Sequence, residues 1–236
     1  MYTICILALC VLSTFFITQN YQLYKRKCFS YWLVTSCLVG WLEFFFYLRH
    51  DAWIFDPGHI CGLYVLGVTI EDIIFCPCFS IIFYWIYHRL KPKYSQRVYN
   101  PDDKMIYAIA VLGIIVFNFN IGSVFGKYMA FRTALGCIGL LYCWNFSSFR
   151  HSLIFMLIVF CIAAGWDIPF VNLEIWVYTK DIQSFPPVYD GHLYLKIFKA
   201  IFPIELWSYY VSGAMFSYWT LAFFDRYTSR QRKIIK

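Results

Sequence analysis

The sequence predicts an all-α integral membrane protein, and two observations carry this prediction. Apolar residues make up 61% of the 236 residues and charged residues only 14%, against roughly 25% charged in a usual soluble domain. The apolar residues also occur in long runs without the alternation of a membrane β-strand, so helices are the expected spanning elements. These features exclude an ordinary soluble enzyme, a disordered chain and a secreted disulfide scaffold.

Reading the chain for apolar runs of about 20 residues predicts seven transmembrane helices. In order, the runs cover residues 2–19, 29–49, 64–87, 105–121, 129–146, 151–177 and 200–224. The first is expected to be a retained span, because no basic residue precedes it and no small-residue cleavage site follows it. Polar residues interrupt the chain between the fourth and fifth runs.

The basic residues predict that the N-terminus lies outside and the C-terminus in the cytoplasm. Most of the 20 Lys and Arg residues fall in segments that this orientation makes cytoplasmic, namely 20–28, 88–104, 147–150 and the tail from Asp225. Cytoplasmic loops carry such an excess. The net charge of +7 is therefore interpreted as a topological signal, and it does not indicate nucleic-acid binding.

Two parts of the chain carry the same features in the same order: a Gly-Trp pair, an acid, a Trp-x-aromatic triplet, a loop with Asp, Gly and His, and an Ile-Glu pair. In the first part these are Gly40-Trp41, Glu43, Trp53-Ile54-Phe55, Asp56-Pro57-Gly58-His59 and Ile70-Glu71, and in the second Gly165-Trp166, Asp167, Trp176-Val177-Tyr178, Asp190-Gly191-His192 and Ile204-Glu205. Membrane catalysts and transporters are often built from such repeats.

The repeat divides the predicted fold into two parallel three-helix repeats and a connecting helix. The first repeat is expected over residues 1–99, the connecting helix with its loop over 100–128, the second repeat over 129–224, and a basic cytoplasmic tail over 225–236. The matched spans run in the same direction, which makes the repeat parallel.

No metal or cofactor is expected. Most of the 10 cysteines lie in apolar runs, as small buried thiols do. Cys76-Pro77-Cys78 is a close pair without a second pair or a nearby His, so it does not indicate zinc. A dinucleotide-binding Gly-x-Gly-x-x-Gly motif is missing, and Gly136-Cys137-Ile138-Gly139 lies inside a predicted span.

Six acids lie within or at the rim of predicted spans, where a central carboxylate costs about 2.5–3.5 kcal/mol. They are Glu43, Glu71, Asp72, Asp167, Glu174 and Glu205. Four of them come from four different spans and are expected at one layer, about 9–15 Å below the outer surface. These four are Glu43, Glu71, Asp167 and Glu205. No Lys or Arg lies at a similar depth to pair with them. The alternative is that an acid caps a broken helix, and for Glu174 the two interpretations weigh equally.

Carboxyl groups that share a site of low dielectric constant can hold a proton on one while another is ionised. That arrangement provides a general acid beside a general base. Aromatic residues, which attract cations through their ring faces, make up 23% of the chain. Buried acids with an aromatic lining suit protonation of a carbon–carbon double bond, followed by loss of a different proton.

Two motifs in this setting resemble the cofactor-independent lycopene cyclases. They are Thr69-Ile70-Glu71-Asp72-Ile73-Ile74-Phe75 and Pro203-Ile204-Glu205-Leu206-Trp207-Ser208-Tyr209, and Asp167 with Trp176 also fits the family pattern. The resemblance covers nearly the whole chain. It implies the fused form of the heterodimeric bacterial and archaeal enzymes, which is also found as the N-terminal domain of fungal bifunctional carotenoid proteins.

The resemblance implies a cofactor-free isomerase that closes the ends of lycopene into β-ionone rings. It implies Glu71 and Glu205 as proton donor or base, with Asp167 and Glu43 in support and Asp72 secondary. The long polyene would come from the bilayer and lie against Trp41, Trp53, Trp166, Trp176 and Phe75. The motifs depart from the family pattern at Thr69, Asp72 and Leu206, which leaves another isoprenoid substrate open.

Three other functions share some of these sequence features. A proton-coupled transporter of an apolar solute would also use layered acids and a parallel repeat. A retinal-type photoreceptor needs a Schiff-base lysine in the middle of the last span, where only Lys196 and Lys199 lie near its outer edge. A non-catalytic subunit that presents its basic tail to anionic lipid would not need four converging carboxylates.

Overall fold

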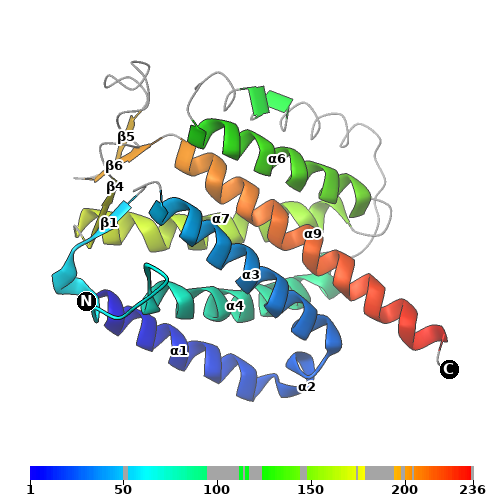
Figure 1. Cartoon of the computed structure of the whole chain (residues 1–236). Coiled ribbons are helices and arrows are strands. Elements are labelled where there is room, and N and C mark those ends of the chain that lie inside the picture. The colour runs from blue at the N-terminus through cyan, green and yellow to red at the C-terminus, as the bar shows by residue number, and fades with distance from the viewer. Residues whose placement is uncertain are drawn as a thin grey trace. The chain divides into compact units, whose positions relative to one another are not determined.

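In the computed structural model the chain is mostly helical (Figure 1). The structure describes residues 1–49, 53–94, 112–113, 115–116, 124–143, 148–173, 175–178, 194–197, 200–203 and 205–234. The chain forms two compact units. The first contains Met1–Ile86, Asp167–Ile182 and Phe224–Lys236, and the second contains Tyr87–Trp166 and Gln183–Phe223.

Within the described residues there are seven α-helices, one 3-10 turn and six short strands. The helices are α1 (Tyr2–Gln19), α2 (Tyr21–Tyr24), α3 (Lys27–Arg49), α4 (Ile70–Tyr94), α6 (Val124–Cys143), α7 (Phe149–Asn172) and α9 (Glu205–Ile234), and η1 is Pro57–His59. The strands are β1 (Trp53–Phe55), β2 (Tyr64–Val65), β3 (Val68–Thr69), β4 (Trp176–Tyr178), β5 (Tyr194–Ile197) and β6 (Ala200–Pro203).

Four described helical segments are long and apolar enough to cross a membrane: Tyr2–Gln19, Lys27–Phe45, Ile70–Lys91 and Arg150–Asn172. The prediction of a helical protein with membrane-spanning segments is confirmed to this extent. The predicted span 105–121 lies mostly outside the described residues. The seven-span count and the orientation stay predictions.

The faces of α1 show why this helix suits a lipid environment. Most of its exposed residues are apolar, and among them Ile4, Leu7, Val11 and Phe15 are between 55% and 71% exposed. The residues that it buries include Tyr2 and Ser13, which carry hydroxyl groups. A helix at the surface of a soluble protein has the opposite pattern, with apolar residues inward and polar residues outward.

The predicted start of the third span is wrong, because residues 64–69 form a β-hairpin. Strands β2 and β3 pair antiparallel, with Tyr64 opposite Thr69 and Val65 opposite Val68. The two-residue loop has positive φ at Leu66 (53°) and Gly67 (83°), the combination that a type I′ hairpin turn requires. Helix α4 therefore begins at Ile70, so Glu71 lies in its first turn and not two turns inside a span.

The ends of two other predicted spans are wrong for a similar reason. The run expected to continue to residue 177 stops being helical at Asn172, and residues 176–178 form β4. The run expected from residue 200 begins as β6, paired antiparallel with β5, before α9 starts at Glu205. In each case strand pairing satisfies the backbone polar groups that a helix would otherwise satisfy.

The order of elements agrees with the repeat seen in the sequence. After α3 come β1, the hairpin β2–β3 and α4, and after α7 come β4, the hairpin β5–β6 and α9. The two Trp-x-aromatic triplets also pair with each other as β1 and β4. Trp53 lies opposite Tyr178, and Phe55 lies opposite Trp176, so the pairing is symmetric about its centre.

Two glycines allow α6 and α9 to pack closely within the second unit. A Cβ atom at Gly136 would lie 3.1 Å from the Met215 side chain, and one at Gly139 would overlap the indole ring of Trp219. Small residues at helix–helix contacts are typical of membrane proteins. The Gly136–Gly139 segment, which the sequence placed inside a span, thus has a packing role.

Replacing Gly139 by Ala is expected to destabilise the protein by about 1–3 kcal/mol, because the added methyl group forces the Trp219 ring to move. Thermal unfolding in detergent measures the effect. Gly165→Ala in α7 is the matched control, since nothing lies within 4 Å of its added Cβ, and it should be neutral or slightly stabilising. Equal stability of the two variants would contradict the packing role.

Candidate functional site

The acid pair Glu71–Asp72 lies in the first turn of α4, directly after the hairpin. The side chain of Thr69 caps this helix, because its Oγ1 accepts a hydrogen bond from the backbone N–H of Asp72 at 3.3 Å. Glu71 is 1% exposed and Asp72 3%. A helix N-terminus stabilises negative charge, so the position offsets part of the cost of burying two carboxyl groups.

One oxygen of Glu71 is held by two donors. Its Oε1 accepts a hydrogen bond from the Thr3 hydroxyl at 2.5 Å and another from the Cys61 backbone N–H at 2.7 Å. Its other oxygen, Oε2, is buried and has no hydrogen-bond partner among the described residues. The two oxygens of this carboxyl group are therefore in different chemical environments.

Asp72 has the same asymmetry. Its Oδ1 accepts a hydrogen bond from the Tyr2 hydroxyl at 2.9 Å. Its Oδ2 is buried and lacks a partner within the described part of the chain. Both acids are thus held by neutral donors, and each keeps one buried oxygen without a hydrogen bond.

The ring of Tyr2 in α1 connects two other elements to this acid. It stacks on Phe55 of β1 with ring centroids 5.4 Å apart, and it contacts Phe170 of α7 edge to face at 5.5 Å. Tyr2 itself is 2% exposed. Because the ring is fixed on both sides, its hydroxyl has little freedom to leave Asp72.

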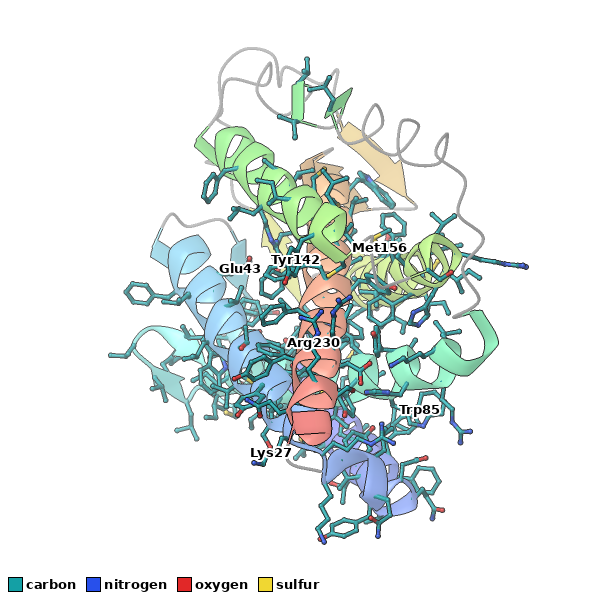
Figure 2. The ribbon with its side chains drawn as sticks, turned by 90° about the vertical axis from the view of Figure 1, so that its right-hand side faces the viewer. Lys27, Glu43, Trp85, Tyr142, Met156 and Arg230 are labelled. Carbon is teal, nitrogen blue, oxygen red and sulfur yellow. The ribbon has the colours of Figure 1, made fainter. Side chains whose placement is uncertain are left out.

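Glu43 and Asp167 belong to the same unit as the acid pair. Glu43 lies in the last two turns of α3, at the end opposite Lys27 (Figure 2), and is 7% exposed. It and Asp72 both interact electrostatically with the Cys76 thiol group. Asp167, which is half-buried, interacts electrostatically with Asp72. The structure thus gathers four predicted site acids near the start of α4.

The remaining predicted acids are not placed at this site. Glu205 is the first residue of α9 and belongs to the second unit. Its side chain lies outside the described residues, and so does Glu174. Their predicted roles stay predictions.

The predicted substrate-contacting aromatics have mixed positions. Trp41 is 37% exposed, and its indole N–H donates to the backbone carbonyl of Ile73 in α4 at 3.0 Å. Trp53 and Trp176 lie on the paired strands β1 and β4, but their side chains are outside the described residues. Trp166 is half-buried near the end of α7 and belongs to the second unit.

Phe75 begins an aromatic row along α4, one helical turn after Glu71. Its ring lies 4.2 Å from that of Phe79, and the Phe79 ring lies 5.5 Å from that of Phe83. At 1.5 Å per residue, the row from Glu71 to Phe83 extends for about 18 Å. The acid pair therefore lies at one end of a long aromatic surface, most of it half-buried or buried.

Sequence reasoning missed Tyr2 and Thr3, which contact the acids across about 70 residues of chain. A signal for them existed, because the predicted orientation starts the first and third spans at the same side of the membrane. That orientation places hydroxyl groups at the start of the first span level with acids at the start of the third.

Among the described residues, the acids around Tyr2 do not bring three metal-ligating atoms within reach of one ion. Two buried carboxyl oxygens without a hydrogen-bond partner among the described residues, close to aromatic rings, are suited to proton transfer. No protein-family model, curated protein or solved structure matches this chain.

Proposed function

We propose that this protein is a membrane-embedded cyclase of the lycopene cyclase type, which closes the ends of a long polyene by acid–base chemistry. The observation that carries the proposal is the pair of buried acids, Glu71 and Asp72, each with one oxygen that has no hydrogen-bond partner among the residues that the structure describes. An acid of this kind can give its proton to a carbon–carbon double bond, because no acceptor in the described part of the chain competes for the proton.

The reaction requires only that protons move. A carboxyl O–H bond breaks, and its proton forms a C–H bond with the π electrons of a terminal double bond. A second double bond attacks the resulting cation and closes the ring. A carboxylate then removes a proton from the carbon next to the cation, which leaves a double bond in the ring. One proton is added and one removed, so substrate and product are isomers.

The row Phe75, Phe79 and Phe83 supports a long apolar substrate. Aromatic ring faces stabilise positive charge, and the row starts one turn from Glu71. A polyene drawn sideways from the bilayer could lie along this row with its end at the acid pair. Asp167 interacts electrostatically with Asp72, and Glu43 interacts with the Cys76 thiol group one turn further along α4.

The proposal includes the predicted topology of seven spans, with the N-terminus outside and the C-terminus in the cytoplasm. It also includes two parallel three-helix repeats. The matching order of strands, hairpins and helices in the two parts of the chain supports the repeat. The symmetric pairing of β1 with β4 also supports it, because equivalent segments related by a two-fold axis pair in this way.

Expression in cells that accumulate lycopene, followed by chromatography of the pigments, tests the proposal. Formation of γ- or β-carotene is the expected result. When the reaction runs in D₂O, the product should carry deuterium, because the acid exchanges its proton with solvent between turnovers. Unchanged lycopene in the presence of well-inserted protein would overturn lycopene as the substrate, and the same assay would then be run with other isoprenoid chains.

A further inference from the structure

We infer that the first turn of α1 is part of the reaction site, and that Thr3 and Tyr2 fix which carboxyl oxygens exchange protons with the substrate. The inference rests on the proposed function. It assigns Oε2 of Glu71 and Oδ2 of Asp72 as the reacting atoms. It makes Thr3 and Tyr2 positioning residues, since both act through the acids that they hold.

Two hydrogen bonds to Oε1 of Glu71 decide where its proton can lie. An oxygen that accepts from both Thr3 and the Cys61 backbone N–H has its lone pairs engaged and no room for a proton of its own. When Glu71 is protonated, the proton therefore lies on Oε2. That atom is buried and has no acceptor among the described residues, so its proton is not held by a hydrogen bond to any of them.

Asp72 is held in the same way. The Tyr2 hydroxyl donates to Oδ1, which leaves Oδ2 as the oxygen without a hydrogen bond. The Tyr2 ring is held between Phe55 and Phe170, so the donor stays in place. Adjacent residues of one helix, Glu71 and Asp72, are thus matched by adjacent residues of another, Thr3 and Tyr2.

The alternative is that these hydroxyl groups serve only to stabilise the packing of α1 on α4. A structural role would affect the amount of folded protein and its thermal stability. A positioning role affects the chemical step in the protein that does fold. The two are separated by measuring kcat and KM on purified protein, and by the pH dependence of kcat.

Thr3→Val, which removes the hydroxyl and keeps the shape, is the main test, and Thr3→Ser, which keeps the hydroxyl, is its rescue. We expect kcat of Thr3→Val to fall about 10–100-fold, with KM nearly unchanged and an altered pH dependence of kcat. Thr3→Ser should stay close to the wild type. Thr14→Val is the matched control, since the Thr14 hydroxyl bonds only within α1, to the Cys10 carbonyl, in the contacts described.

Tyr2→Phe tests the second contact, because it keeps the packed ring and removes only the hydroxyl. Its matched control is Tyr21→Phe at a residue that is 58% exposed. If both Thr3→Val and Tyr2→Phe keep the wild-type kcat and the wild-type pH profile of kcat, this inference is wrong, while the proposed function is unaffected. Equal losses in Thr3→Val and Thr3→Ser would also overturn it. A wild-type protein that forms no ring from any polyene would instead overturn the proposed function.

Discussion

Replacement of Glu71 by Gln is expected to reduce ring formation by about 10²–10⁴-fold, which is the usual contribution of a general acid or base. Gln has almost the same shape as Glu. Its carbonyl oxygen can keep both hydrogen bonds, from the Thr3 hydroxyl and from the Cys61 backbone N–H. Its amide group takes the place of Oε2 and cannot exchange a proton with a double bond. The variant therefore removes the chemistry and keeps the local structure.

The measurement is pigment chromatography from lycopene-accumulating cells, with the amount of protein in the membrane fraction determined in parallel. Asp56→Asn is the matched control. Asp56 is a half-exposed acid in the same unit that caps η1 through the Gly58 N–H, and Asn can make the same cap. Turnover of Glu71→Gln equal to that of Asp56→Asn would exclude Glu71 as acid or base.

The parts of the fold that could be predicted from sequence are those set by long apolar runs. The run 2–19 matches α1 residue for residue, and the helical parts of α3, α4 and α7 fall within or close to their predicted spans. An apolar run of this length can hydrogen-bond all of its backbone N–H and C=O groups within the segment, in lipid, only by forming a helix. Apolar character alone is then sufficient.

The short strands could not be predicted in the same way. Leu63-Tyr64-Val65-Leu66 is as apolar as the helix that follows it, so hydropathy does not separate a hairpin from a helical turn. Only Gly67 signals the turn, and Leu66 adopts positive φ without being a residue that favours it. The contacts from α1 to the acid pair depend on tertiary packing, which no local pattern in the sequence encodes.

The two acid motifs differ in ways that bear on their roles. Thr69 caps α4 and is followed by two acids, whereas Pro203 has no side-chain hydroxyl and Glu205 is followed by Leu206. In the first motif a second carboxyl group is available beside the first. In the second motif Glu205 has no acid directly beside it in the sequence, so no adjacent residue can replace it when it is substituted.

Replacement of Glu205 by Gln is expected to abolish turnover to a similar degree, about 10²–10⁴-fold, while the protein still inserts. The expectation comes from its place in the repeat, because Glu205, like Glu71, follows a hairpin and lies in the first turn of a helix. The same pigment assay measures it. Asp190→Asn is the matched control, since Asp190 has the same place in the second sequence repeat that Asp56 has in the first.

The comparison of the two Gln variants shows which part of the chain supplies the proton donor and which supplies the base. If both lose turnover, each part of the chain supplies a group to the proton cycle, and one acid cannot serve as both donor and base. If only Glu71→Gln loses turnover, Asp72 and the other acids gathered near α4 are sufficient to accept the second proton, since they already lie beside the donor. Glu205 would then have a structural role, because an acid in the first turn stabilises the N-terminus of its helix.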